Sequence, residues 1–467
     1  MEERDLIVIG GGPAGYVAAL RATQLGGKVT LVEGKELGGT CLNWGCIPTK
    51  FLLHSTDVYQ SMKFTQQYGI SVEGVKIDLS RMQTCKNAVV STLVAGLQGR
   101  LESSRVEIIK GWAKLVAANK VEVDLGKGPK QTIQARKIII ATGSKPATIP
   151  VPGANSPDIL NSDGMLSLGK LPKSLIIIGG GAIGVEMATI FARLDCKVTI
   201  VELMPHCLPN QDGEIAIALE DVLREDGIQI RCNAKVSRID DTARGKSIVY
   251  SDSAGEHKLE GESVAITTGY APNINNLGIE ECGIALDGSK IKVNERMETS
   301  VPGIYAAGDV VGGMLLAHVG FAEGKVAAEG AMGQDSRIDY QAIPQGIFSS
   351  PEVASVGLTE EEATSQGFEL QIGRFPFTSN SMATILGERR GLVKIITEQK
   401  YGQVLGVHII GLRATSLIPE AALAMKMEAT FQEIAATIHA HPSLSEALWG
   451  AALDVSDQMI LSSSANG

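Results

Sequence analysis

The sequence predicts an α/β protein in which one strand–helix–strand unit occurs twice and a segment of α+β character closes the chain. A short apolar strand at residues 5–9 leads through a glycine-rich turn into an alanine-rich helix, and a second strand follows at 28–33. The same pattern of strand, helix and strand returns at residues 175–178, 185–194 and 197–202. A βαβ unit takes about 30 residues, so both copies have the expected length. We interpret them as an internal duplication.

The C-terminal part of the chain has a different pattern. Strand-like stretches at 393–396 and 404–410 alternate with helices that we expect at 360–365, 418–427 and 431–436. No glycine-rich fingerprint occurs there. We therefore predict an α+β domain in this part of the chain.

Prolines indicate where a chain of 467 residues, too long for one ordinary core, divides into domains. Pro146, Pro150 and Pro152 precede the second unit, and Pro272 and Pro344 follow it. We therefore expect four segments, at residues 1–147, 148–271, 272–343 and 344–467.

The charge balance limits the partners. A net charge of −10 argues against nucleic acid or an anionic membrane as the main partner, because phosphate binding needs clustered Lys and Arg. No uncharged apolar run reaches about 18 residues, so we expect no membrane insertion. The first strand begins at Asp5, which leaves no room for a signal peptide before it. We expect a cytoplasmic (bacterial) protein or a mature organelle protein.

Each copy of the repeated unit carries a G-x-G-x-x-G fingerprint and an acid at the end of its second strand. The residues are Gly10, Gly12, Gly15 and Glu33 in the first copy, and Gly179, Gly181, Gly184 and Glu202 in the second. Such glycines allow a tight turn, let the backbone approach a pyrophosphate and let the helix pack closely on the strand. The phosphate then lies at the helix N-terminus, and the acid accepts hydrogen bonds from a ribose. The sequence therefore predicts two Rossmann-like dinucleotide-binding domains.

The two sites differ in the nucleotide that we expect. Glu202 repels a 2′-phosphate, and residues 203–210 contain no Arg or Lys to hold one, so the second site is predicted to bind NAD rather than NADP. Gly308 and Asp309 follow a strand-like segment, where Asp309 can bind a ribityl hydroxyl and the backbone can approach closely. This favours FAD at the first site. The stretch 141–143, with Thr142 and Gly143, is interpreted as a crossover between the two domains.

Cys41 and Cys46 are the only two of seven cysteines that lie close together in the sequence. On a regular helix they would be separated by about 7.5 Å of axial rise, whereas a disulfide needs Cα atoms within about 7 Å. Either the pair is not bonded or the helix is distorted, and Gly45 and Pro48 provide the means of distortion. We interpret the stretch as a helix that holds a strained, reducible disulfide. Zinc binding lacks further ligands nearby, so we expect no metal site, and two buried thiols are the other alternative.

The remaining cysteines are interpreted as ordinary, partly buried thiols; they are Cys85, Cys196, Cys207, Cys232 and Cys282.

Two histidines near the C-terminus are candidates for the base that thiol exchange requires. A free thiol has a pKa of about 8.5, so little thiolate exists at neutral pH unless a group such as His accepts the proton. His439 and His441 both lie in the stretch 438–446, which we expect to start a helix. A carboxylate on the other ring nitrogen would fix the tautomer.

Together these stretches resemble the class I pyridine nucleotide–disulfide oxidoreductases, and within them the dihydrolipoamide dehydrogenases most closely, over residues 5 to about 450. The resemblance implies that Cys46 lies against the flavin as the charge-transfer thiolate and that Cys41 is the exchanging thiol. It also implies an ion pair between Lys50 and Glu186 near the flavin, and a role for Gly269 in the cofactor sites.

The resemblance further implies that His441, which precedes a proline, is the base and that Glu446 is its carboxylate, with the His–Pro peptide in the cis form. His439 is then a supporting or surface residue. In this family the histidine comes from the partner subunit, so we expect a homodimer whose interface domain is 344–467 and resembles the family from residue 350 onward. The segments 1–147, 148–271 and 272–343 become an FAD-binding domain, an NAD-binding domain and a central segment that completes the FAD site.

The activity implied is oxidation of protein-bound dihydrolipoamide with NAD as the acceptor. The partner would be the lipoyl domain of an acyltransferase in a 2-oxo acid dehydrogenase-type complex, or a glycine-cleavage carrier. The alternatives are a related NAD(P)H-dependent disulfide reductase and a structural subunit of a multienzyme core. Tyr270, Met382 and Ser416 depart from the family pattern, although none of them carries the chemistry.

Overall fold

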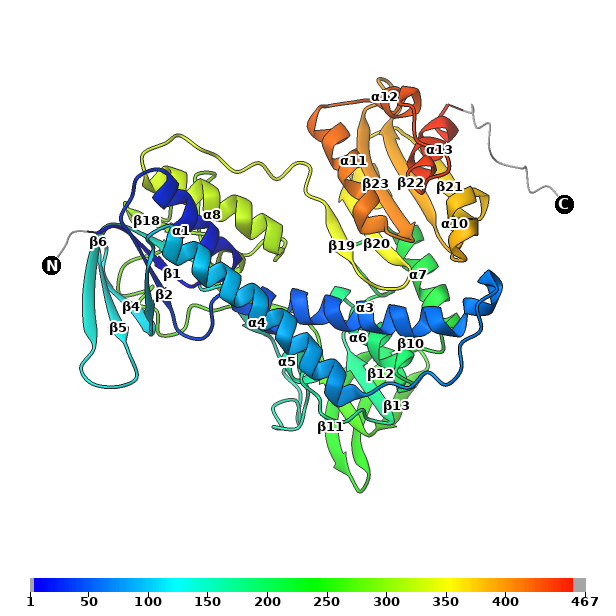
Figure 1. Cartoon of the computed structure of the whole chain (residues 1–467), viewed down its shortest axis with the longest axis horizontal. Coiled ribbons are helices and arrows are strands. Elements are labelled where there is room, and N and C mark those ends of the chain that lie inside the picture. The colour runs from blue at the N-terminus through cyan, green and yellow to red at the C-terminus, as the bar shows by residue number, and fades with distance from the viewer. Residues whose placement is uncertain (1–3, 457–467) are drawn as a thin grey trace. The chain divides into compact units, whose positions relative to one another are not determined.

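The structure, a computed structural model, describes residues 4–456, which form two compact units (Figure 1). The first unit contains residues 4–52, 76–147 and 269–339. The second contains residues 53–75, 148–268 and 340–456. Among the helices of the described residues, none is both long enough and apolar enough to span a bilayer. The division into four functional segments stays a prediction.

The first unit is built on a sheet whose central strands are parallel, in the order β3-β2-β1-β6, with β18 pairing with β6. These strands are β1 (Arg4–Ile9), β2 (Val29–Glu33), β3 (Glu107–Lys110), β6 (Gln131–Ile140) and β18 (Ile304–Ala306). The antiparallel strands β5 (Lys120–Asp124) and β4 (Trp112–Ala117) extend the sheet beyond β6. Its longer helices are α1 (Pro13–Gln24), α4 (Leu79–Ser103) and α8 (Ala317–Ala331). Two short pairs complete the unit, β7 (Ser144–Pro146) with β15 (Tyr270–Pro272) and β16 (Leu286–Asp287) with β17 (Lys290–Ile291).

Alternation along the strands divides the core of this unit into two layers. Leu6 and Val8 of β1 pack with the α1 and α8 side, whereas Ile7 and Ile9 pack with the side of β4 and β5. Successive side chains of a strand point to opposite faces, so a strand that is apolar throughout is buried on both faces. The expected strand at 5–9 is confirmed, and the helix that follows it packs directly on α8.

The second unit contains the repeated βαβ motif. Its parallel sheet has the order β10-β9-β8-β14. The strands are β8 (Ser174–Ile178), β9 (Lys197–Val201), β10 (Gln229–Arg231) and β14 (Ser263–Ile266), and the helices are α5 (Ser162–Leu166), α6 (Ala182–Arg193) and α7 (Gly213–Glu225). An antiparallel sheet is formed by β11 (Lys235–Thr242), β12 (Gly245–Asp252) and β13 (Gly255–Gly261). The duplication is confirmed, with small shifts at the ends of the elements: β9 ends at Val201, one residue before the acid.

The C-terminal part of the second unit is a five-stranded antiparallel sheet in the order β19-β20-β23-β22-β21. Its strands are β19 (Gln345–Ile347), β20 (Glu352–Gly357), β21 (Leu370–Pro376), β22 (Leu392–Glu398) and β23 (Val404–Gly411). Its helices are α9 (Glu360–Ser365), α10 (Ser381–Leu386), α11 (Ala414–Lys426), α12 (Phe431–Ala436) and α13 (Glu446–Asp454). The predicted α+β domain is confirmed.

One prediction for this part of the chain is wrong. The stretch 438–446 does not start a helix, because α13 begins only at Glu446 and the residues before it are irregular. Pro442 has no N–H to donate, and α12 ends at Ala436. The two candidate histidines therefore lie in the connection between α12 and α13.

A buried ion cluster in the second unit joins the start of α7 to the C-terminal sheet. Lys394 of β22 is 1% exposed and Asp212, the N-cap of α7, is 0% exposed. The Lys394 Nζ lies 2.9 Å from Asp212 Oδ1, 3.1 Å from Glu214 Oε2 and 2.6 Å from Glu360 Oε2. Such a cluster fixes how α7 packs on the C-terminal sheet.

Candidate active site

The first glycine turn, between β1 and α1, has the geometry of a pyrophosphate cradle. Gly10 has φ +104°, and a Cβ there would lie 2.2 Å from the carbonyl oxygen of Ala141. At Gly15 a Cβ would lie 1.8 Å from the carbonyl oxygen of Gly10, so α1 can approach β1 only without a side chain. Gly12, by contrast, faces open space, where the nearest atom to a Cβ is 3.9 Å away. A ligand can therefore approach the backbone at the start of α1.

Glu33 is held beside this turn. Its Oε2 accepts the N–H of Gly11 at 2.6 Å, and its Oε1 accepts the N–H of Lys35 at 2.6 Å. Both bonds orient the carboxylate at the end of β2, next to the cradle. This is the arrangement in which an acid meets the ribose of a dinucleotide.

The second glycine turn repeats these features. Gly179 has φ +110°, and a Cβ at Gly184 would lie 2.0 Å from the carbonyl oxygen of Gly179. No atom lies within 4 Å of a Cβ at Gly181, which leaves the start of α6 open. Glu202, 7% exposed, accepts the N–H of Gly180 on Oε2 and that of Met204 on Oε1.

Thr267, which the sequence did not single out, supports the second turn. Its hydroxyl donates to the carbonyl oxygen of Gly179 at 2.9 Å. Gly269, two residues later in the sequence, already belongs to the first unit. It has φ +113° and no atom within 4 Å of a Cβ, so it too leaves space for a ligand.

The ends of β6 and β18 bring a second group of polar residues together in the first unit. Ser144 Oγ donates to Asp309 Oδ2 at 2.5 Å, and burial raises the pKa of the Asp309 carboxyl. The hydroxyl of Thr142 is buried and has no hydrogen-bond partner among the described residues. Gly143 has φ +67° and open space around it. An unpaired buried hydroxyl is costly, so a polar ligand group at Thr142 fits this site.

These observations meet the requirements of a bound flavin dinucleotide: a bare backbone cradle, an oriented acid, an orphan hydroxyl and a desolvated carboxyl. Ser144, missed in the sequence, belongs with them. Gly308, adjacent to Asp309, donates its N–H to Glu323 Oε2 at 2.7 Å, which fixes the turn.

The cysteine pair lies where the helix is interrupted, as expected. α2 (Gly39–Trp44) ends before Gly45, whose φ of −136° and ψ of −111° are not helical, and α3 (Cys46–Lys63) begins at once. A Cβ at Gly45 would lie 2.8 Å from the carbonyl oxygen of Thr40. The interruption lets the two side chains meet. The pKa of the Cys41 thiol is raised, first by its hydrogen bond with Cys46 and then by burial, while the charge of Lys50 acts in the opposite direction.

Tyr16 is a neighbour of the pair that the sequence did not reveal. Burial, followed by the charges of Cys41 and Cys46, raises its pKa to about 12. Its ring lies 5.9 Å from that of Phe321. The phenol therefore stays protonated at physiological pH. The signal in the sequence was its position directly after Gly15.

In the second unit, His441 and Glu446 form a pair. His441 Nδ1 lies 2.9 Å from Glu446 Oε1, and the side chain of His441 is 70% exposed. The other carboxylate oxygen accepts the N–H of Ser443 at 2.7 Å, and Asn380 Nδ2 donates to the carbonyl oxygen of Ser443 at 2.9 Å. The His441–Pro442 peptide is cis, as expected. The ring is thus held by one nitrogen and presented to solvent.

His439 has a carboxylate of its own. Its Nε2 lies 2.9 Å from Glu420 Oε1, and this contact raises the pKa of His439. Its side chain is 5% exposed, so it supports the connection rather than facing outward.

Lys50 and Glu186 belong to different units, so their ion pair stays a prediction. Glu186 is 5% exposed, and its Oε1 accepts the N–H of Phe348 at 2.9 Å.

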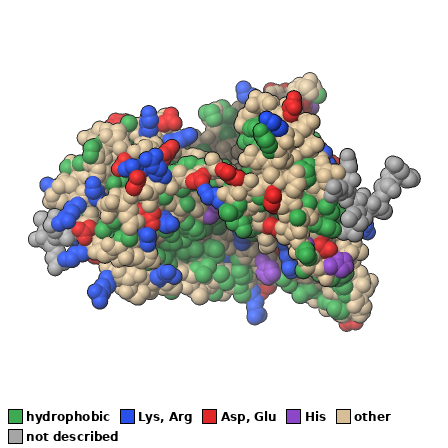
Figure 2. Space-filling model, turned by 90° about the horizontal axis from the view of Figure 1, so that it is seen from above, with side chains coloured by type: hydrophobic (Ala, Val, Ile, Leu, Met, Phe, Trp, Pro, Cys, Tyr) green, Lys and Arg blue, Asp and Glu red, His purple; other side chains and the backbone are tan. Residues whose placement is uncertain are grey.

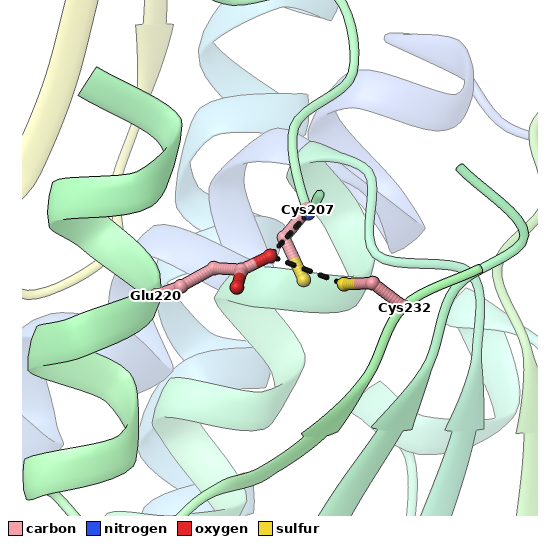
Figure 3. A group of neighbouring side chains, drawn as sticks. All are labelled: Cys207, Glu220 and Cys232. Atoms are coloured by element: carbon pink, nitrogen blue, oxygen red, sulfur yellow. Dashed lines mark hydrogen bonds between the residues drawn. The ribbon is translucent and has the colours of Figure 1, made fainter. Parts of the chain in front are cut away.

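One interpretation of the remaining cysteines is corrected by the structure. Cys207 and Cys232 are not separate thiols but lie together beside Glu220 (Figure 3), and the pKa of Cys207 is raised first by its hydrogen bond with Cys232. Cys85 is exposed rather than partly buried.

The chain matches two family models. The first is described as "Pyridine nucleotide-disulphide oxidoreductase" and covers residues 4–324; the second, "Pyridine nucleotide-disulphide oxidoreductase, dimerisation domain", covers residues 343–452.

Relatives resemble the chain over nearly its whole length. It is 39% identical to "Dihydrolipoyl dehydrogenase, mitochondrial" of Pisum sativum, with 98% of this chain and 93% of that protein covered. It is 41% identical to "Dihydrolipoyl dehydrogenase" of Geobacillus stearothermophilus, with 95% and 94% covered. Among solved structures, LpdA from Mycobacterium tuberculosis has a TM-score of 0.88 and 29% identity, with 96% of this chain and 98% of that chain covered.

Proposed function

Because the chain belongs to the pyridine nucleotide–disulphide oxidoreductases, we propose that it oxidises protein-bound dihydrolipoamide to lipoamide with NAD as the acceptor. It is an enzyme of a flavin-dependent family, and FAD and NAD are its cofactors. The observation that carries the proposal is the contact between Cys41 and Cys46 at the interrupted helix, in the same unit as the first glycine cradle. The names of the two relatives at about 40% identity support the choice of substrate.

Two groups of residues would hold the cofactors. FAD would be bound by residues of the first unit, namely Gly10, Gly12, Gly15, Glu33, Thr142, Gly143, Gly308 and Asp309. NAD would be bound by Gly179, Gly181, Gly184 and Glu202 of the second unit, and Gly269 would contribute to a cofactor site from the first unit. When bound, FAD accepts an electron pair from the dithiol and delivers it as hydride to NAD. The segments 1–147, 148–271 and 272–343 would then be the FAD-binding, NAD-binding and central segments.

The residues of the chain carry out the thiol exchange. His441 takes the proton of one substrate thiol, and the resulting thiolate attacks Cys41 Sγ. A substrate–Cys41 bond forms as the Cys41–Cys46 bond breaks, and Cys46 leaves as a thiolate. The second substrate thiol, once deprotonated, attacks the substrate sulfur that is bonded to Cys41. The substrate disulfide forms, and Cys41 leaves as a thiolate. Two electrons and two protons thus leave the substrate, the electrons residing on Cys41 and Cys46.

The protonation of the reduced pair follows from its surroundings. Contact with Cys46 and burial raise the pKa of Cys41, so Cys41 keeps a proton. The negative charge is then left to Cys46, the thiol that is assigned to the flavin. Lys50, whose charge opposes the rise in the pKa of Cys41, would stabilise that charge, and Glu186 would be its counter-ion.

Glu446 acts through His441. Its carboxylate beside Nδ1 favours the tautomer that carries the proton on Nδ1, which leaves Nε2 as the acceptor. Glu446 is itself oriented by the N–H of Ser443, so the ring has a fixed direction.

A homodimer would bring His441 to the cysteines of the other subunit. The dimerisation family model supports this assembly, and residues 344–467 would form the interface domain. Leu423, Met427 and Ile438, which lie close to His441 in the sequence, expose 64%, 72% and 97% of their surface. Apolar side chains of this kind are typical of a surface that a partner covers.

The second partner would be a lipoyl domain of an acyltransferase or of a glycine-cleavage carrier, and the compartment would be the bacterial cytoplasm or an organelle matrix.

On the face that Figure 2 shows, Lys and Arg are interspersed with Asp and Glu, without a basic patch for nucleic acid.

The proposal is tested by following NADH formation with free dihydrolipoamide, with NADP in place of NAD and glutathione in place of dihydrolipoamide as controls. Cys41→Ser and Cys46→Ser should each abolish turnover, whereas Cys85→Ser, which alters an exposed thiol, should retain it. Turnover in Cys46→Ser equal to that of the parent would overturn the scheme. Greater activity with glutathione and NADP would instead indicate a different disulfide reductase.

A further inference from the structure

Cys207, Glu220 and Cys232 form a compact group in the second unit, outside the proposed active site. Cys207 lies in the turn after β9, Glu220 on α7 and Cys232 just after β10 (Figure 3). Their sulfur and carboxylate ligand atoms all lie within 4.8 Å of one another, and in the described part of the chain no other three His, Cys, Asp or Glu side chains are grouped in this way.

The donor set suits a borderline-soft cation. Zinc binds thiolate sulfur at about 2.3 Å and carboxylate oxygen at about 2.0–2.2 Å, so the ligand atoms of a tetrahedral site lie about 3.6–3.8 Å apart. The Cys232 thiol already donates to Glu220 Oε1 at 3.1 Å, which puts a positive hydrogen where a cation would lie. Oε2 of the same carboxylate is held by Arg224 at 2.6 Å, so the group needs little reorganisation to present its other oxygen.

The backbone on both sides of the group is constrained. Leu208, directly after Cys207, has φ +53°, and Asn233, directly after Cys232, has φ +52°. The first of these is unfavourable for a branched side chain. Such strain persists only where surrounding contacts enforce it, and it gathers at sites that hold side chains in set directions. Between these positions both sulfur atoms lie within 4.8 Å of a carboxylate oxygen of Glu220, whose Oε1 also accepts the N–H of Cys207 at 2.7 Å.

The group lies against the second glycine turn. A Cβ at Gly180 would be 2.8 Å from Cys207 Sγ and 3.2 Å from Glu202 Oε2. The carbonyl oxygen of Gly180 accepts the N–H of Leu208 at 2.8 Å. Any movement of Cys207 is therefore passed to the turn that is proposed to bind NAD.

We propose that Cys207, Glu220 and Cys232 bind one thiophilic divalent cation, with Zn²⁺ as the expected ion, and that its binding weakens NAD binding. Both thiols release a proton to solvent as the cation binds, and the fourth position is open to water. Drawing Cys207 Sγ toward the other ligands shifts Leu208 and with it the carbonyl of Gly180, so the turn is a poorer cradle for the pyrophosphate. This second effect rests on the proposed NAD site, whereas cation binding does not.

The test uses the full chain with FAD bound and Cys41→Ser and Cys46→Ser present, so that the redox pair cannot bind metal. Equilibrium dialysis against Zn²⁺ should give one ion per chain, and X-ray absorption at the zinc edge should show two sulfur ligands at about 2.3 Å. Cys207→Ser or Cys232→Ser in this background should remove the bound ion. Glu220→Gln should weaken binding about 10- to 100-fold, the loss that even a supporting residue of a metal ligand causes.

Cys196→Ser is the matched control, since Cys196 is a buried thiol of the same unit that lies outside the group. It should bind zinc like the parent background, and circular dichroism of every variant guards against misfolding. The proposal is overturned if the variant with both Cys207→Ser and Cys232→Ser still binds one zinc ion per chain. It is also overturned if the parent background binds no zinc.

NAD binding to the same background, measured by calorimetry with and without saturating Zn²⁺, tests the coupling. We expect NAD affinity to fall about fivefold or more, and zinc affinity to fall by the same factor with NAD present. Unchanged NAD affinity in the zinc-loaded protein rejects the coupling. Absence of NAD binding before zinc is added counts instead against the proposed NAD site, and the zinc stoichiometry is read independently of it.

Discussion

Replacing Lys394 by Met should destabilise the second unit through the charge that it leaves behind. The ammonium lies 2.9 and 3.0 Å from the two oxygens of Asp212, whose side chain is 0% exposed. Without Lys394, Asp212 still accepts the N–H groups of Glu214 and Glu360 at 3.1 and 3.2 Å, but its charge has lost its counter-ion.

The size of the effect follows from burial. Removing one partner of a buried pair costs about 3–5 kcal/mol, because the other charge is left in a medium of low dielectric constant. Glu214 and Glu360 are 34% and 39% exposed, so each adds at most about 1 kcal/mol. We therefore expect the free energy of unfolding to fall by about 3–7 kcal/mol, most of it from the buried Asp212. Lys394→Met combined with Asp212→Asn should recover about 2 kcal/mol of this loss.

Trp449 in α13 gives a local signal for the measurement. With Trp44→Phe and Trp112→Phe, it is the remaining tryptophan of the three in the chain, and its Nε1 donates to the carbonyl oxygen of Ala435 at 2.9 Å. Urea unfolding with excess FAD, followed by Trp449 fluorescence, yields the comparison. A loss below about 1 kcal/mol in Lys394→Met, or no recovery in the double variant, would refute the argument from burial.

Three further outcomes are expected. Glu446→Gln should lower kcat for dihydrolipoamide by about 10²- to 10⁴-fold, with NADH binding unchanged, and a loss below about tenfold in stopped-flow reduction by dihydrolipoamide would contradict the role of His441 as a fixed base. Glu202→Gln should raise KM for NAD about 10- to 100-fold in steady-state assays and reduce the preference for NAD over NADP, because a charged hydrogen bond is worth about 1.5–3 kcal/mol; an unchanged ratio of the NAD and NADP activities would show that Glu202 does not contact the nucleotide. Burial lowers the pKa of His408 in the folded state, so the neutral ring contributes fully to stability above about pH 6.5, its unfolded pKa, and this stability is lost as the pH falls toward the lower folded pKa. His408→Gln should therefore make the free energy of unfolding depend less on pH in this range. An equal pH dependence in parent and variant would count against this role of His408.

The ion cluster around Lys394 is a feature that could not be predicted from the sequence. Lys394 and Asp212 are 182 residues apart, and a lysine within an apolar strand carries no mark of its partner. The repeated βαβ units were readable because their glycines, apolar strands and terminal acids act over about 30 residues, where turn geometry and strand burial are local. The helix expected at 438–446 failed for the opposite reason: the carboxylates of Glu420 and Glu446 hold His439 and His441 in an irregular connection, which helix propensity does not report.

The duplicated unit explains why one cysteine pair could be predicted and the other could not. In both copies the glycine turn donates an N–H to the terminal acid, from Gly11 to Glu33 and from Gly180 to Glu202. In both, a cysteine follows the acid: Cys41 eight residues after Glu33 in the first copy, and Cys207 five residues after Glu202 in the second.

The difference lies in the origin of the second thiol. Cys46 follows Cys41 after five residues, so that a single interruption of the helix at Gly45 brings the sulfurs together. Cys232 reaches Cys207 only because β10 pairs in parallel with β9, with α7 lying between them in the sequence. The first pair is therefore brought together by the local structure of one segment, and the second by the pairing of two strands that are distant in the sequence. In this chain a cysteine thus follows each glycine turn and its acid, and the distance in sequence to the second cysteine determines whether the sequence alone can disclose the pair.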